Sequence, residues 1–370
     1  MFLPVIKPAF RLALKIITII IYILTLISAF GGRINPEYFA APSVLVLPLP
    51  YLAIASALLT LAWLCTGRFI IGGLGVVTLV SAWSPITTAV PLNSSKKAEN
   101  PSDTFTVLSY NWLHGDDQER GNDAPGNRAV SYLINCGADI ICLQEMADWD
   151  DTSEVHNLTP ALRDSLKRIY PYWAGSNGVD QKVLSKFPIE RVDVRELYSE
   201  PSDNTKFSFF KTRIKGVPVW IVNMHMNSYM LTEEERGVVS EIASIKKTKE
   251  GISELKGSIY SKLKYSFRER KTHTEVLVKA LENAKGRVIV CGDFNDVPES
   301  YAYRMMREAG FRDVTQETTF GPMITYNRHA FWFHLDQIFY RGGLKALSVK
   351  KGKIRTSDHY PLLAEFEIER

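Results

Sequence analysis

Two short acidic motifs that follow apolar runs place the strongest constraint on how this chain folds. Residues 288–291, Val-Ile-Val-Cys, lead into Gly-Asp-Phe-Asn-Asp, which contains Asp293 and Asn295. A second motif contains Asp358 and His359, and a strand-like run follows it at Leu362–Phe366. Because an apolar, β-branched run is typical of a buried strand, a polar side chain just past its end should lie at the rim of a sheet. Carboxylates and an imidazole at such a rim are suited to metal-assisted hydrolysis.

The first quarter of the chain is unusually apolar. Three apolar stretches occupy Leu12–Phe30, Val44–Cys65 and Phe69–Val90, and each has about 19 to 22 residues, enough to cross the hydrocarbon core of a bilayer. The first stretch is similar to a signal peptide, but no small-residue cleavage site follows it neatly and two further stretches come after it. We therefore expect residues 1–92 to form a membrane anchor with three transmembrane helices, rather than buried helices of a soluble protein.

Basic residues around the first stretch indicate an orientation. Lys7, Arg11 and Lys15 precede it and only Arg33 follows it, which favours a cytoplasmic N-terminus. Three crossings would then place the rest of the chain outside the cytoplasm, although two lysines after the third stretch disagree. The sequence predicts a multi-pass membrane protein whose second region is extracytoplasmic, in a periplasm or a lumen.

The second region is separated from the anchor by a linker rich in Pro, Asn, Ser and Lys at residues 93–103. Residues 101–370 contain 37 basic and 38 acidic residues, so this region lacks the broad basic footprint of a nucleic-acid-binding protein. The four cysteines show no metal-site spacing and are expected to be buried, unreactive thiols.

Strand and helix patterns alternate over residues 104–370. The strand patterns outnumber the helix patterns, and short turns such as residues 215–217 join several pairs. This arrangement predicts an α/β (α+β) fold in which two mostly antiparallel sheets pack together with helices outside. The clearest expected strands are residues 105–110, 139–143, 207–214, 217–224, 335–340 and 362–368.

A basic amphipathic insert occupies about residues 232–272. Thr232 and Glu235 form a plausible capping box, and apolar residues then recur at helical spacing. Between Lys246 and Lys271 there are nine basic and three acidic residues. Two interpretations stay open: a solvated helix packed on the sandwich, or a shelf that anionic lipid headgroups attract. Residues 331–334, Phe-Trp-Phe-His, are either an aromatic rim of the same opening or part of the core.

Eight polar residues follow or end the apolar runs of this region. Each alone would be an ordinary structural residue or turn cap, but the eight together predict an active site. They are Asn111, Glu145, His225, Asp293, Asn295, Asp336, Asp358 and His359.

The order of the motifs and their residues resemble those of the endonuclease/exonuclease/phosphatase superfamily. The resemblance covers roughly residues 104–368 and implies a four-layered α/β sandwich and hydrolysis of a phosphoester, without specifying the substrate. The matching segments are residues 108–111 (Leu-Ser-Tyr-Asn), 141–145 (Ile-Cys-Leu-Gln-Glu), 184–189, 223–225, 292–295, 335–339 and 357–359.

The resemblance also implies a metal site. Glu145 would be the principal ligand of a divalent cation, and Asn111 and Asp358 would contribute directly or through water. Ligands that offer only oxygen suit Mg2+ or Mn2+.

Roles in catalysis follow from the same resemblance. Asp293 would orient or deprotonate the attacking water, and Asn295 would donate a hydrogen bond to the phosphoryl oxygens. Asp336 would hold His359, which would stabilise the developing negative charge. His225 would be a second imidazole at the phosphate or the leaving group, where abasic-site endonucleases have tyrosine.

Three functional hypotheses follow. The first is a membrane-anchored, metal-dependent phosphodiesterase or phosphatase acting on a lipid headgroup or a related phosphoester at the bilayer surface, since tethering raises the effective concentration of such a substrate. The second is a membrane-anchored nuclease that degrades extracytoplasmic DNA or RNA. The third is a non-catalytic binding module, against which the intact set of eight polar residues argues.

Overall fold

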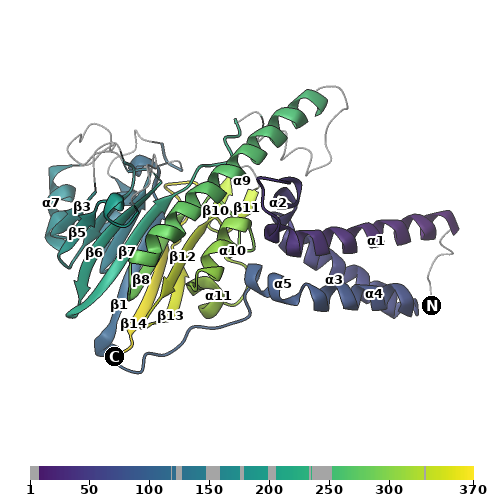
Figure 1. The fold of residues 1–370 in the computed structure, drawn as a ribbon, viewed down its shortest axis with the longest axis horizontal. Coiled ribbons are helices and arrows are strands. Elements are labelled where there is room, and N and C mark those ends of the chain that lie inside the picture. The colour runs from purple at the N-terminus through teal and green to yellow at the C-terminus, as the bar shows by residue number, and fades with distance from the viewer. Residues whose placement is uncertain are drawn as a thin grey trace.

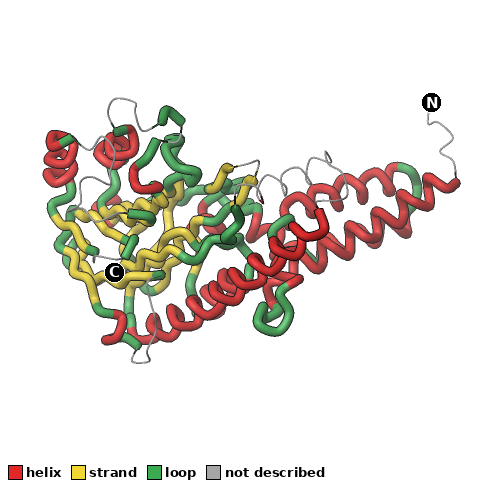
Figure 2. The backbone as a smooth tube through the Cα atoms, turned by 90° about the horizontal axis from the view of Figure 1, so that it is seen from above, coloured by secondary structure: helices red, strands yellow, loops and turns green. Residues whose placement is uncertain are grey.

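An arm of apolar helices extends from a two-sheet sandwich (Figure 1). The computed structural model describes residues 8–117, 119–121, 127–146, 159–175, 179–198, 206–232, 235, 252–328 and 331–370. Viewed from above, the arm points away from the sandwich on one side (Figure 2). The helices of the arm are α1 (Pro8–Phe30), α2 (Ala41–Val46), α3 (Leu49–Cys65), α4 (Phe69–Ser81) and α5 (Trp83–Ala89).

The expectation of three transmembrane helices is not met. Among the described residues, one helix (Phe10–Arg33) is long and apolar enough to cross a bilayer. The bent pair α4–α5 would be a second span only if its two helices together made a single crossing. The second expected stretch breaks at Pro48 and leaves an α3 of 17 residues, because proline lacks the N–H that a continuous helix needs at this position. The third stretch bends by 61° between α4 and α5.

Polar side chains lie inside the arm. The Tyr22 hydroxyl of α1 lies 2.9 Å from Thr60 Oγ1 of α3, and Thr25 Oγ1 lies 2.8 Å from Ser56 Oγ. By contrast, apolar side chains on the outer faces are largely exposed, for example Ile17 and Leu58. The arm therefore has the reverse of the polarity pattern of a water-soluble helical bundle.

The sandwich contains two mixed sheets. Among the described strand pairs, only β1–β2 and β7–β8 are parallel, so the prediction of mostly antiparallel pairing is confirmed. The first sheet has the order β13 (Leu344–Lys351), β14 (Leu362–Ile368), β1 (Thr104–Asn111), β2 (Ile140–Gln144), β4 (Lys182–Ser185), β3 (Tyr172–Ala174). The second has the order β5 (Ile189–Val192), β6 (Phe207–Ile214), β7 (Val217–His225), β8 (Arg287–Asp293), β12 (Asp336–Arg341), β9 (Arg312–Asp313).

Helices cover the outer face of each sheet, which gives the α/β sandwich expected from the sequence. Helices α6 (Arg128–Asn135) and α7 (Pro160–Ile169) pack on the first sheet. Helices α9 (Ile252–Asn283) and α10 (Tyr301–Glu308) pack on the second. The remaining elements are α11 (Val314–Thr318), a ribbon of β10 (Tyr326–Arg328) and β11 (Phe331–Phe333), and the short 3-10 helices η1 (Gly31–Arg33), η2 (Pro101–Asp103), η3 (Leu113–Gly115) and η4 (Val194–Glu196).

Strand direction gathers the predicted site at one edge. The carboxyl ends of the parallel pairs β1–β2 and β7–β8 lie at this edge. Because β12 is antiparallel to β8 and β14 is antiparallel to β1, the first residues of these two strands lie there as well. A Cβ on Gly292 (φ +147°) would lie 1.9 Å from the Met224 carbonyl oxygen, so only glycine lets β8 approach β7 this closely.

The basic insert is partly structural. Glu235 accepts a hydrogen bond from the Thr232 N–H at 2.8 Å and donates its own N–H to Thr232 Oγ1 at 3.2 Å, which is the predicted capping box. Lys262 Nζ lies 2.6 Å from Glu235 Oε2, and Leu277 and Leu281 of α9 belong to the core beneath the second sheet. Three lysines of the proposed membrane shelf, Lys246, Lys247 and Lys249, lie outside the described residues.

Candidate active site

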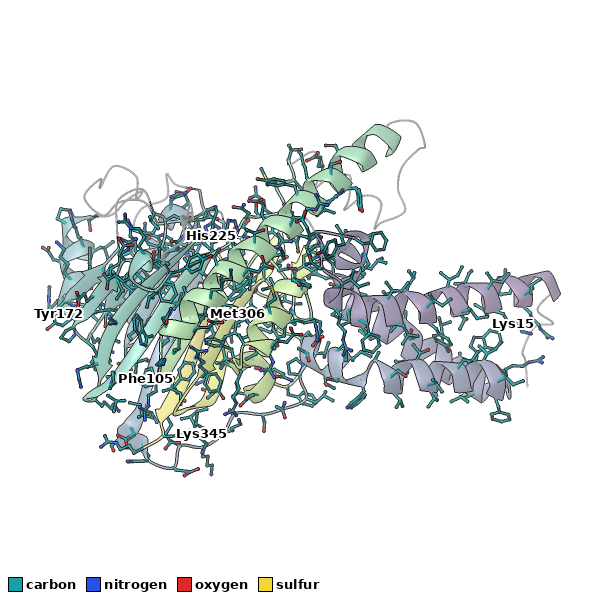
Figure 3. The ribbon with its side chains drawn as sticks, viewed as in Figure 1. Lys15, Phe105, Tyr172, His225, Met306 and Lys345 are labelled. Carbon is teal, nitrogen blue, oxygen red and sulfur yellow. The ribbon has the colours of Figure 1, made fainter. Side chains whose placement is uncertain are left out.

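The edge of the sandwich where the site residues gather is marked by His225, which lies at the upper ends of the strands in Figure 3. Seven of the eight predicted residues are linked there by short contacts, and Asp358 lies beside His359 in the chain. Asn111, His225 and Asp293 are the last residues of their strands, and Asp336 is the first of β12. In the sheet register Asp293 lies opposite both His225 and Asp336.

Asp293 is the centre of the cluster. Its Oδ2 accepts hydrogen bonds from Asn111 Nδ2 and Asn295 Nδ2, both at 3.1 Å, and its Oδ1 accepts one from the Asn295 N–H at 2.7 Å. Burial raises the pKa of Asp293 above its ordinary value, although nearby His359 acts to lower it. A carboxylate made more basic by burial is suited to accept a proton from water.

His359 and Asp336 form a buried pair. His359 Nδ1 lies 2.8 Å from Asp336 Oδ2, and His359 Nε2 lies 3.5 Å from Asp293 Oδ2. Burial acts to lower the pKa of His359, but the carboxylates of Asp336 and Asp293 outweigh it and raise this pKa to about 10. The ring is therefore an imidazolium at neutral pH, able to stabilise negative charge on a phosphoryl group.

Glu145 lies at the entrance of the site. Asn111 Nδ2 donates to its Oε1 at 2.9 Å. The backbone of Glu145 is left-handed at φ 53°, as is that of Asn295 at φ 48°. This conformation costs a non-glycine residue about 1 to 3 kcal/mol and is concentrated at functional sites.

His225 has a partner that sequence reasoning missed. Its Nδ1 lies 2.5 Å from Asp180 Oδ2, and its Nε2 lies 3.6 Å from Glu145 Oε1. Burial acts to lower the pKa of His225, but the hydrogen bond with Asp180 and the charge of Asp293 raise it overall. Asp180 lies just before β4, which is antiparallel to β2, so its place at this edge follows from strand direction.

Two buried amides beneath the site were also missed. Gln144 Nε2 donates to Asn223 Oδ1 at 2.6 Å, which joins β2 of the first sheet to β7 of the second. Asn223 Nδ2 in turn donates to the Leu143 and Lys182 carbonyls. Hydrogen bonds between buried amides favour one alignment of packed elements, so this pair helps to fix how the two sheets meet below the site.

The donor set fits a divalent cation. Glu145 and Asp293 are carboxylates that share one amide donor, Asn111, and a cation would offset their mutual repulsion. Asp293, Asp336 and His359 also have ligand atoms within 4.8 Å of one another and form a second group that could hold a metal ion. Asp358, the third predicted ligand, contacts Arg328 Nη1 at 3.5 Å, and among the described contacts it does not touch Asn111 or Glu145.

The chain is similar to a known family and to several solved structures. Residues 108–359 match the model of the Endonuclease/Exonuclease/phosphatase family. Over 88 residues the chain is 42% identical to the UPF0294 protein of Erwinia tasmaniensis, a match that covers 23% of this chain and 30% of that protein. Similar solved structures include an endonuclease/exonuclease/phosphatase from Beutenbergia cavernae (TM-score 0.46, 12% identity, 72% of each chain) and the human Nocturnin catalytic domain (TM-score 0.44, 19% identity, 72% of this chain and 95% of that one).

Proposed function

Since this chain belongs to the endonuclease/exonuclease/phosphatase family and is a hydrolase of phosphoester bonds, we propose that it hydrolyses a phosphoester in the headgroup of a membrane lipid. The observation that carries this proposal is the reversed polarity of the arm, which packs hydroxyl groups inside and exposes aliphatic side chains outside. A bilayer would cover those aliphatic side chains. Helix α1 is the proposed membrane-crossing helix, and the extracytoplasmic position of the sandwich is part of the same proposal.

Contacts between the arm and the rim of the site support a lipid substrate. The Tyr51 hydroxyl of α3 donates to the Trp332 carbonyl of β11 at 3.2 Å. Arg268 of α9 donates to the Glu37 carbonyl, which follows α1, at 2.7 Å. These contacts hold the catalytic edge close to the apolar helices, so a headgroup at the bilayer surface would be within reach.

The proposed metal ligands are Glu145 and Asn111, with Asp358 contributing directly or through water. Mg2+ or Mn2+ bound there would withdraw electron density from the phosphoryl oxygens and neutralise their charge. The family typically depends on a divalent metal ion, and the oxygen-rich donor set of this edge agrees with that chemistry.

The other site residues have proposed roles in moving protons and stabilising charge. Asp293 accepts the proton of the attacking water, because burial makes its carboxylate more basic. Asn295 and the charged ring of His359 donate hydrogen bonds to the phosphoryl oxygens as negative charge develops on them. Asp336 positions His359, and Asp180 positions His225, which donates a proton toward the leaving group.

A panel of phosphoesters tests this function. The purified full-length chain, with Mg2+, would be given phospholipid vesicles, inositol phosphates and plasmid DNA, and the Asp293→Asn variant would report contaminating activity. We expect a water-soluble phosphate ester to be released from the vesicles by the wild type alone. Preferential cleavage of plasmid DNA would instead establish the nuclease alternative.

A further inference from the structure

An apolar cavity lies where the arm meets the sandwich. It has a volume of about 450 Å3 and is bounded by α2, α3 and α5 on one side and by residues 297–298, 322–324 and 332–334 on the other. This volume is within the range of ordinary ligand sites. Representative lining residues are Val46, Ile54, Ala57, Trp83, Met323 and His334.

His334 is the polar exception in the wall of this cavity. The residue is only 7% exposed, and neither Nδ1 nor Nε2 has a hydrogen-bond partner in the described part of the chain. Burial lowers the pKa of His334 to about 3, and the nearby backbone of Asp336 opposes this shift only in part. A buried polar group without a partner is costly, but both ring nitrogens are themselves buried, so the other atoms of His334 line the cavity.

The surroundings indicate what kind of ligand would enter. Ile54 and Trp83 line the cavity and are 60% and 58% exposed, so its wall is continuous with the apolar outer surface of the arm. A hydrocarbon chain can pass from that surface into the cavity without crossing a polar barrier, whereas a phosphate or a sugar would lose its hydration.

The cavity is also joined to the catalytic edge. Val297 comes two residues after Asn295, and His334 comes two residues before Asp336. Val46 of the arm and Val297 pack in one cluster with Tyr326, and the Tyr326 ring contacts the His359 ring edge-on at a centroid distance of 5.0 Å. A chain held in the cavity would therefore keep its polar end near the site.

We propose that this cavity binds one hydrocarbon chain of a membrane lipid. The placement of the headgroup at the catalytic edge rests on the proposed function, whereas binding of the chain itself does not. The bound lipid is either the substrate or a resident lipid of the same chemistry.

Photolabelling tests the proposal on the full-length chain. The protein would be placed in nanodiscs of phosphatidylglycerol and phosphatidylcholine that contain a phosphatidylcholine with a diazirine on its acyl chain, and labelled residues would be mapped by mass spectrometry. Met323 is the informative residue, because it lines the cavity and is only 8% exposed. We expect Met323 to be labelled in the wild type.

Matched variants of α3 make the labelling specific. Ala57 and Ala62 are both exposed, and only Ala57 lines the cavity. Ala57→Phe should fill part of the cavity and reduce labelling of Met323 about fivefold or more, whereas Ala62→Phe should leave it within about twofold. His334→Leu should leave the labelling within about twofold, because both ring nitrogens are buried away from the cavity. Unlabelled Met323, or equal labelling in both alanine variants, would overturn the proposal.

Hydrolysis measured in the same nanodiscs separates this inference from the proposed function. If Met323 is labelled and no lipid is hydrolysed, the cavity binds a resident lipid and the proposed lipid substrate is wrong. If lipid is hydrolysed and Met323 is not labelled, the proposed function stands and the cavity inference is wrong.

Discussion

The catalytic edge and the junction with the arm each bury a histidine, and they do so in opposite ways. His359 lies 2.8 Å from the Asp336 carboxylate, which contributes to raising its pKa to about 10. His334 has no hydrogen-bond partner among the described residues, and burial lowers its pKa to about 3. The two residues are 4% and 7% exposed, so burial alone does not decide the charge of the ring.

In this protein the neighbouring groups of a buried histidine determine the charge of its ring. At the edge, carboxylates hold the ring in its charged form, which suits it to act on a phosphoryl group. At the junction no carboxylate of the described residues pairs with the ring, and burial keeps it neutral. Four variants test this difference between the two regions.

The largest effect is expected from Glu145, whose side chain is part of the catalytic edge. Glu145→Ala should reduce metal-stimulated hydrolysis about a thousandfold or more at saturating Mg2+, because its proposed role is to bind the metal ion. The circular dichroism spectrum should be unchanged. Glu317→Ala is the matched control, since Glu317 forms ion pairs with Lys96 and Arg312 away from the site. Near-normal turnover in Glu145→Ala would remove Glu145 from the site.

Asp293→Asn should lower kcat about a hundredfold to a thousandfold and change KM by less than about threefold, because the proposed role of Asp293 is to act on the nucleophile. Asp313→Asn is a control with the same chemical change in another buried carboxyl, which is hydrogen-bonded to the Tyr303 hydroxyl. Its kcat should stay within about twofold of the wild type. A large rise in KM with unchanged kcat would contradict the assignment of Asp293 as the base.

Asp336→Asn should lower kcat about tenfold and change the pH–rate profile. In the proposed mechanism the charged form of His359 is the active one, so the wild-type rate should fall as the pH approaches about 10. Without the carboxylate this alkaline limb should move toward the ordinary imidazole value of 6.5. The pair should also stabilise the fold in a pH-dependent way, because the pKa of His359 is higher in the folded chain than in the unfolded one. Its contribution to the free energy of unfolding is complete below pH 6.5 and is lost as the pH rises through about 10. An unchanged alkaline limb would mean that the two residues do not act as a pair.

The smallest effect concerns the junction. In detergent without added lipid, His334→Leu should stabilise the protein by about 1 to 3 kcal/mol, because it removes a buried polar group that lacks partners. The folded pKa of His334 is about 3 against 6.5 unfolded, so below pH 6.5 the unfolded chain binds a proton that the folded chain does not. Stability should therefore decrease between pH 6.5 and 3, and His334→Leu should reduce that slope. Thermal unfolding at several pH values measures both, and a destabilised variant would show that the ring has a partner.

The catalytic edge could be predicted from sequence to the extent that local patterns mark strand ends. Asn111, His225 and Asp293 end their strands as expected, because apolar runs and the polar residues after them are visible in the chain itself. Their partners depend on which strands pair. Asp180 reaches His225 only because β4 is antiparallel to β2, and the Gln144–Asn223 bond requires the two sheets to face each other.

The arm was predicted less well, because an apolar stretch indicates how long a helix could be but not whether that helix is continuous. Pro48 divides the second stretch, and the chain bends by 61° between α4 and α5 in the third. The role of His334 was also beyond local reasoning. Residues 331–334 suited either a rim or the core, and only the packing of α3 and α5 against residues 322–334 shows that its ring lies in the wall of a cavity.

The most direct test is a titration of the seven histidines by nuclear magnetic resonance in the metal-free protein labelled with nitrogen-15. His359→Gln and His334→Leu would assign the two ring signals that matter. The His359 ring should stay charged through neutral pH and titrate near pH 10, while the His334 ring should stay neutral down to about pH 3. Titration of both rings near pH 6.5 would contradict the claim that their partners set the charge of these two buried histidines.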